Sequence, residues 1–200
     1  MSRFGSVFSS SVHFTAMLSS NERQMLLSVV REAIASALRA EPFTPPPPNT
    51  EALARPAGAF VTLRHDHELR GCIGYIESEK PLIQVVAEVA VKAAFDDPRF
   101  PPLRREEFER VSIEVSVLTP LRCIHSIDEI EVGVHGIVVV LGARRGLLLP
   151  QVAVEHHLDR EAFLTAALHK AGLPASFRHA PDLELYVFEA EVVSEADVLQ

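Results

Sequence analysis

The sequence is poor in cysteine, has no excess of positive charge and has no long apolar run. Two cysteines in 200 residues, Cys72 and Cys123, are too few for a disulfide framework and favour a reduced, cytoplasmic setting. The formal net charge of −8 argues against nonspecific binding to nucleic acid or to anionic membranes. No apolar run is long enough to span a bilayer. Phosphate-binding glycine loops and zinc-ligand spacings are also missing, so the sequence names no cofactor and predicts no metal site.

The first twenty residues are expected to form a tail ahead of a single domain over residues 21–200. They hold one arginine and many serines without a continuous apolar segment, which is not typical of a secretory signal. The chain is 48% hydrophobic and 23% charged, as in an ordinary soluble globular protein. Its length suffices for one good core or for two closely packed lobes.

Three segments carry apolar residues at helical spacing, and we expect helices over residues 20–40, 81–97 and 160–171. The first of these begins with a capping box formed by Ser19 and Glu22. Prolines follow this helix and predict a stiff extended connector, either a surface linker or a ligand for an aromatic groove.

Strand patterns occupy the stretches between these helices. We expect strands over residues 60–63, 69–75, 111–119 and 183–193, and a hairpin with a long first strand over residues 132–149. The polar turn over residues 65–68 joins the first two strands and offers two histidines without a third metal ligand. Helices and strands do not alternate strictly, so the fold class is α+β, with a mixed sheet, packed helices and a smaller lobe.

The stretch Leu69–Gly74, with the sequence LRGCIG, is the most distinctive part of the chain. By strand alternation, Arg70 and Cys72 share one face. Gly71 and Gly74 indicate a bulge, a tight bend, or close approach of a ligand or another backbone. Two interpretations stay open: a buried and inert cysteine, or a thiol whose thiolate the neighbouring guanidinium favours.

Four further residues are candidates for a site. Asp97 lies at a helix C-terminus, where the helix dipole disfavours an anion, so it is expected either to pair with Arg99 or to line a cleft. Glu114 lies on the polar face of its strand and is either solvated or opposes Arg70. His135 lies between two glycines at the start of a strand, where a ligand has access.

These residues support two hypotheses about function. In the first, the chain is an enzyme with Cys72 as nucleophile, His135 as acid or base, and Glu114 as the orienting residue. In the second, it is a binding domain whose cleft holds a small molecule, a peptide or a partner loop, and Cys72 only packs. The predicted binding residues are then those of the motif and of the loop after the second helix, namely Arg70, Gly71, Gly74, Asp97 and Arg99.

The hexapeptide and its surroundings resemble the AMMECR1 domain family. The likeness runs in order from Asn21 to Val193 and includes Asp97–Leu103, Ile113–Leu118, Gly133–Gly136, Leu148–Ala153 and Lys170–Pro174. Two positions depart from the pattern of many prokaryotic members: Leu158 stands where they carry tryptophan, and His169 where they carry cysteine.

The resemblance implies a fold with a larger mixed part and a smaller lobe, and it places the motif at an internal cleft between them. Relatives in prokaryotes are often encoded beside Memo-like and radical-SAM proteins. The resemblance therefore implies such proteins as partners and a role as one component of a modification pathway. It implies no specific reaction.

Overall fold

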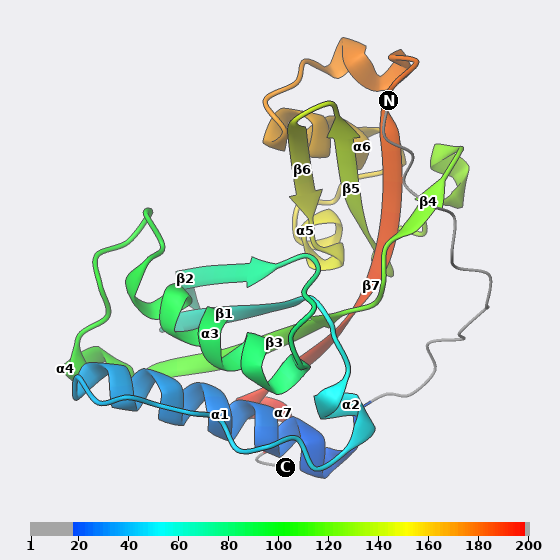
Figure 1. Cartoon of the computed structure of the whole chain (residues 1–200). Helices are drawn as coiled ribbons and strands as arrows, with labels where there is room; N and C mark the ends of the chain where they lie inside the picture. The colour runs from blue at the N-terminus through cyan, green and yellow to red at the C-terminus, as the bar shows by residue number, and fades with distance from the viewer. Residues whose placement is uncertain (1–17, 199–200) are drawn as a thin grey trace.

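The structure is a computed structural model that describes residues 18–198 (Figure 1). Its helices and strands are, in chain order, α1 (Ser20–Leu38), α2 (Glu51–Ala54), β1 (Ala59–His65), β2 (Glu68–Tyr75), α3 (Leu82–Phe95), α4 (Arg105–Phe108), β3 (Val111–Leu118), β4 (Arg122–Ile124), η1 (Ile127–Glu129), β5 (His135–Leu141), β6 (Arg144–Leu148), α5 (Pro150–Glu155), α6 (Arg160–Lys170), η2 (Ala175–His179), β7 (Glu184–Ser194) and α7 (Glu195–Val198). The predicted α+β class is confirmed.

The strands form one sheet in the order β2-β1-β3-β7-β5-β6, and β4 pairs with β7 beside this path. Every strand pairing within the described residues is antiparallel. The long strand β7 links the two ends of the sheet, because its C-terminal part pairs with β3 and its N-terminal part pairs with β5 and β4. In Figure 1 this strand bends from the upper part of the molecule into the lower part.

The larger core lies between two helices and one face of the β2-β1-β3 segment. Helices α1 and α3 pack against each other and cover this face of the strands (Figure 1). The buried side chains of this core are apolar and include Leu26, Val30 and Ile34 of α1, Val85, Val86 and Val89 of α3, and Val61, Leu63 and Val115 of the strands. Burial of this apolar area is the main source of stability here.

A second core lies at the other end of the sheet, under α6. It contains Phe163 and Leu168 of α6, Ile137 and Val139 of β5, and Val187 of β7. A smaller cluster of Leu118, Val138 and Phe188, against which Phe60 packs, lies between the two. We propose that the two cores are the two closely packed lobes expected within one domain. The large lobe is α1, α3, β1, β2 and β3; the small lobe is β4, β5, β6, α5 and α6.

Local sequence signals account well for α1 and for the β1–β2 hairpin. The capping box is confirmed, since the Ser19 backbone N–H donates to the Glu22 carboxylate and the Glu22 N–H donates to the Ser19 hydroxyl. The predicted turn between β1 and β2 is also confirmed. Asp66 and His67 have φ values of 50° and 69°, the positive pair that a tight two-residue hairpin requires.

The predicted long strand from residue 132 was wrong at its start. Residues 132–134 form a turn in which Gly133 has φ of 88°, and β5 begins at His135. Helix α5 was not predicted, because a six-residue helix is too short to show a helical period.

Of the predicted tail over residues 1–20, the part up to residue 17 lies outside the described residues. Leu18 is buried, and its N–H donates to the Glu191 carboxylate of β7. Ser20 begins α1. The entry into this helix is thus held by a contact that spans nearly the whole chain. Among the helices of residues 18–198, none has the length and apolar character needed to cross a membrane.

Candidate functional site

A β-bulge in β2 places the motif residues differently from simple alternation. Leu63 pairs with Gly71, and the next residue of β1, Arg64, pairs with Leu69, so Arg70 is the extra residue of the bulge. The alternation from which Arg70 and Cys72 were predicted to share a face is therefore interrupted at Arg70. The Arg70 guanidinium contacts Glu107 and Pro102, whereas the Cys72 thiol contacts Thr62.

The two motif glycines lie at close contacts. A Cβ on Gly71 would lie 2.1 Å from the Ala93 carbonyl oxygen of α3, so here the strand backbone meets the helix backbone directly. A Cβ on Gly74 would lie 2.2 Å from Cγ of the Phe60 ring and 2.4 Å from the Ala59 carbonyl oxygen. The expected close approach is confirmed, and the approaching groups belong to the protein itself.

Arg70 is bound by the segment that follows α3. Its Nε and Nη2 atoms donate to the Glu107 carboxylate at 3.1 and 3.3 Å, and Nη2 also reaches the Pro102 carbonyl oxygen at 3.4 Å. These hydrogen bonds lower the pKa of Glu107 to about 2. The counter-charge that contacts Arg70 is thus Glu107, whereas the sequence had favoured Glu114 for this role.

Asp97 and Arg99 close the free edge of β2. The Cys72 N–H donates to Asp97 Oδ2 at 2.9 Å, and Arg99 Nη2 donates to the Cys72 carbonyl oxygen at 3.2 Å. Arg99 also pairs with Asp97 at 2.7 Å and holds the pKa of that buried carboxyl well below its usual range. Edge strands need such partners for their outward backbone groups. The pairing expected between these two residues is present, and it fixes the backbone of the motif.

The strand register aligns four polar residues in one row across the sheet. Thr62 of β1 pairs with Cys72 of β2 on one side and with Glu114 of β3 on the other, and Glu114 pairs with Ser194 of β7. The Thr62 hydroxyl donates to Cys72 Sγ at 3.3 Å. Since neighbouring strands are about 4.8 Å apart, the Cα atoms of Cys72 and Glu114 are separated by roughly 10 Å. We call these four residues the polar row.

The polar row faces the small lobe. Alternation puts Phe60 and Arg64 on the same face as Thr62. Phe60 packs against the cluster that contains Val138 and Phe188, and Arg64 Nη2 lies 3.8 Å from Glu155 Oε1 at the end of α5. In Figure 1, α5 stands between the β1–β2 hairpin and the strands of the small lobe. The row thus lies where the two lobes meet.

The environment of Cys72 keeps its thiol protonated. The residue is partly buried, and burial raises the pKa of the Cys72 thiol above its ordinary value. The hydrogen bond from Thr62 and the charge of Arg99 oppose this effect, but the net direction is upward. Both cysteines are unpaired as predicted, and Cys123 is exposed. A reactive cysteine needs a lowered pKa, and this one has the opposite shift.

His135 lies away from the polar row. It is the first residue of β5, it pairs with Glu189 of β7, and its Nδ1 accepts a hydrogen bond from the Glu131 N–H at 3.0 Å. Along β7, Glu189 is five residues from Ser194, a distance of about 17 Å in a strand. The structure therefore brings Cys72 and Glu114 together and does not bring His135 to them.

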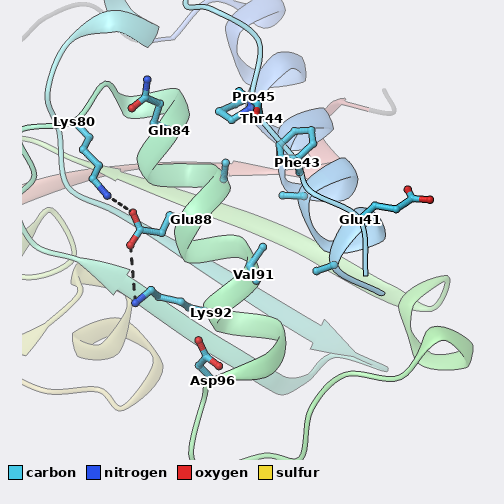
Figure 2. Close-up of a pocket in the computed structure, with 13 residues that line it drawn as sticks. Glu41, Phe43, Thr44, Pro45, Lys80, Gln84, Glu88, Val91, Lys92 and Asp96 are labelled. Carbon is cyan, nitrogen blue, oxygen red and sulfur yellow. Dashed lines mark hydrogen bonds and ion pairs between the residues drawn. The ribbon is translucent and has the colours of Figure 1, made fainter. Parts of the chain in front are cut away.

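A groove lies on the outer side of the large lobe, between α3, the end of α1 and the proline connector (Figure 2). Its volume is about 720 Å³. On its α3 side, Glu88 accepts hydrogen bonds from Lys80 and from the Tyr75 hydroxyl, and Lys92 lies 3.9 Å away. No motif residue lines it. Within residues 18–198, no group of three or more histidine, cysteine or acidic residues could hold a metal ion.

A family model decides the relationship of the chain to known proteins. The AMMECR1 model matches residues 27–193. The chain belongs to the AMMECR1 family. A protein of Methanopyrus kandleri is 46% identical over 189 residues, which cover 90% of this chain and 91% of the relative. One of Methanothermobacter thermautotrophicus is 43% identical over 187 residues, covering 90% of this chain and 97% of the relative.

A solved structure has the same fold. The crystal structure of an uncharacterized protein from Pyrococcus horikoshii is 39% identical in sequence and superposes with a TM-score of 0.79. The match covers 84% of this chain and 88% of that one. At Leu158, one of the two departures from the family pattern, the side chain packs against the core of the small lobe.

Proposed function

We propose that this AMMECR1-family chain is a binding protein whose ligand, a small molecule or a segment of a partner, binds at the polar row, where the two lobes meet. The observation that carries this proposal is the row itself. A sheet face that only stabilised the fold would be apolar where another lobe covers it. Here Thr62 is buried and Cys72 and Glu114 are partly buried on that face.

The surroundings of the motif support binding more than catalysis. The raised pKa of Cys72 leaves a neutral thiol at neutral pH. The alternative, a cysteine enzyme with His135 as its base, requires His135 to contact Cys72. About 17 Å of β7 separates the residue paired with His135 from the polar row, which argues against that contact. A neutral thiol and a threonine hydroxyl beside a carboxylate are suited to hydrogen bonds with a polar ligand.

The contacts of Asp97 and Arg99 with the edge of β2 support the same proposal. Asp97 and Arg99 hold both backbone groups of Cys72, and the contact of Gly71 with α3 fixes the strand from the other side. Binding costs less free energy when the site is already ordered. We propose that Arg70, Gly71, Gly74, Asp97 and Arg99 serve the ligand in this indirect way, by holding the row in place.

We further propose a cytoplasmic setting and an association with Memo-like and radical-SAM proteins in a modification pathway. The cytoplasmic setting is supported by the two unpaired cysteines. The association is supported by the family resemblance alone. Its test is co-purification of the three proteins from a host that encodes them together; separate elution would contradict it.

The binding proposal is tested with the purified whole chain and unbiased metabolite and peptide pools. We expect a retained compound to slow alkylation of Cys72 and to leave that of exposed Cys123 unchanged. Glu114→Gln should weaken retention, whereas Glu109→Gln, an exposed residue after α4, should not. Alkylation of Cys72 that no pool alters, or retention insensitive to Glu114→Gln, would contradict the proposal.

A further inference from the structure

A second concavity lies beside α5, and it contains none of the motif residues. Its volume is about 370 Å³, and α5, β7 and the turn before β5 form its walls. The lining includes Val134 of the turn, Gln151 and Val154 of α5, and Glu189 and Val192 of β7. We call this concavity the α5 pocket. It is separate from the polar row, although both lie at the junction of the lobes.

Apolar side chains are exposed around the α5 pocket. Val132, Val134 and Val154 are 38, 40 and 58% exposed, and they are three of the five large hydrophobic residues that are exposed among the described residues. The turn and the helix are adjacent, since a Cβ on Gly133 would lie 3.3 Å from Cγ2 of Val154. Single exposed valines are common, but a group of them rimming a concavity is typical of a docking surface.

The polar groups of the pocket select for a positive charge and a hydrogen-bond donor. Glu155 and Glu189 are exposed in its wall, and the ion pair of Glu155 with Arg64 is long, at 3.8 Å. The Gln151 side-chain oxygen Oε1 is buried and has no hydrogen-bond partner among the described residues. An unsatisfied buried acceptor costs free energy, and a donor from a ligand recovers it once the Gln151 side chain turns toward the pocket that it lines.

We propose that the α5 pocket binds a segment of a partner protein in which a lysine is flanked by aliphatic residues. The lysine ammonium has three donors and matches the Gln151 oxygen together with the carboxylates of Glu155 and Glu189. The aliphatic neighbours of that lysine cover the three exposed valines. Because exposed Val132 lies outside the lining of the pocket, a chain of several residues fits the surface better than a free amine does.

This proposal does not rest on the one made for the polar row, and the two can fail separately. The probe is the peptide acetyl-Ala-Val-Lys-Leu-Ala-amide, with matched peptides that carry glutamine or glutamate in place of lysine. The readout is the backbone amide chemical shifts of the nitrogen-labelled whole chain. We expect the lysine peptide to shift the amides of Val134, Gln151 and Val154. The glutamine peptide should bind about tenfold more weakly, which corresponds to about 1.4 kcal/mol.

Variants of the chain test the same contacts. Glu189→Gln and Val154→Ser change exposed side chains, so both variants should fold normally. Each should lower the affinity for the lysine peptide by about threefold or more. Glu109→Gln is the matched control and should leave binding unchanged. Amide shifts confined to the groove of Figure 2 or to the polar row would overturn the proposal. So would equal binding of the three peptides, no binding, or a free alkylamine that binds as well as the peptide.

Discussion

The two faces of the β1–β2–β3 segment differ sharply, although their residues alternate along the same strands. The face against α1 and α3 is apolar and almost inaccessible; it carries Val61, Leu63, Ile113 and Val115, none more than 1% exposed. The face toward the small lobe carries the polar row and Ser116, a buried serine whose hydroxyl has no partner among the described residues. Burying polar groups costs free energy. The first face therefore contributes more to the stability of the fold than the second does.

The largest effect is expected on the apolar face. Leu63→Ala should lower the free energy of unfolding by about 3 kcal/mol, because it removes a buried side chain and leaves a cavity against α3. Its neighbour Arg64, on the opposite face and only partly buried, is the matched control, and Arg64→Ala should cost less than about 1 kcal/mol. Denaturant unfolding measures both changes. Equal losses for the two variants would break the comparison.

The next effect concerns the contact between β2 and α3. Gly71→Val should cost upward of about 2 kcal/mol, because the added Cβ would lie 2.1 Å from the Ala93 carbonyl oxygen and strand or helix must move. Gly142 provides the control: its φ is 59° but no atom lies within 4 Å, so Gly142→Ala should cost only about 1 kcal/mol of backbone strain. If thermal unfolding finds Gly71→Val as stable as the parent, the contact does not constrain the motif.

A smaller, pH-dependent effect is expected at the Arg70–Glu107 pair, at the edge of the sheet. The folded pKa of Glu107, about 2, lies below its ordinary value of 4.5. The pair therefore stabilises the fold fully above about pH 4.5, and this contribution is lost as the pH falls toward about 2. Glu107→Gln should cost about 1.5 kcal/mol at neutral pH and flatten the pH dependence of unfolding in that interval. Parallel pH profiles for variant and parent would contradict this.

The smallest effect on stability is expected on the polar face. Ser116→Ala removes the buried unpartnered hydroxyl, so the free energy of unfolding should stay the same or rise by up to about 1 kcal/mol. The same change should leave the α1/α3 core untouched. Calorimetry of the variant measures the change, and a loss of more than about 1 kcal/mol would show that this face contributes to stability after all.

The correct predictions rest on short-range chemistry. The capping box at Ser19, the helix start at Asp159 and the turn at Asp66 and His67 depend on neighbours within a few residues. The close packing at Gly71 was also predicted, because a glycine inside a strand commonly marks a bulge or a backbone that approaches closely. The short helix α5 and the start of β5 were not predicted correctly, since neither segment is long enough to show a regular spacing of apolar residues.

The candidate site was predicted only in part. The side chains of Cys72 and Glu114 share a row because the register of β1 with both neighbours sets it. The turn fixes the pairing of β1 with β2, but β1 and β3 are distant in sequence and no local signal gives their register. One extra residue in β2 interrupts the alternation at Arg70, and the Arg70 guanidinium binds Glu107 of α4 instead of the predicted Glu114. His135 begins a strand, as predicted, but its pairing with Glu189 of β7 places it far from the polar row.

The family, the α+β class, most of the helices and strands, and the glycines that allow close contacts could all be predicted from the sequence. The family likeness runs along most of the chain, and the other features follow from residue order within a window of a few to about twenty positions. Only the tertiary structure decided which charges meet, which face carries the polar row, and that valines, acidic residues and Gln151 surround one pocket beside α5. These depend on the bulge in β2 and on the path of β7 between the lobes. Both join residues that are distant in sequence, and no local pattern records such contacts.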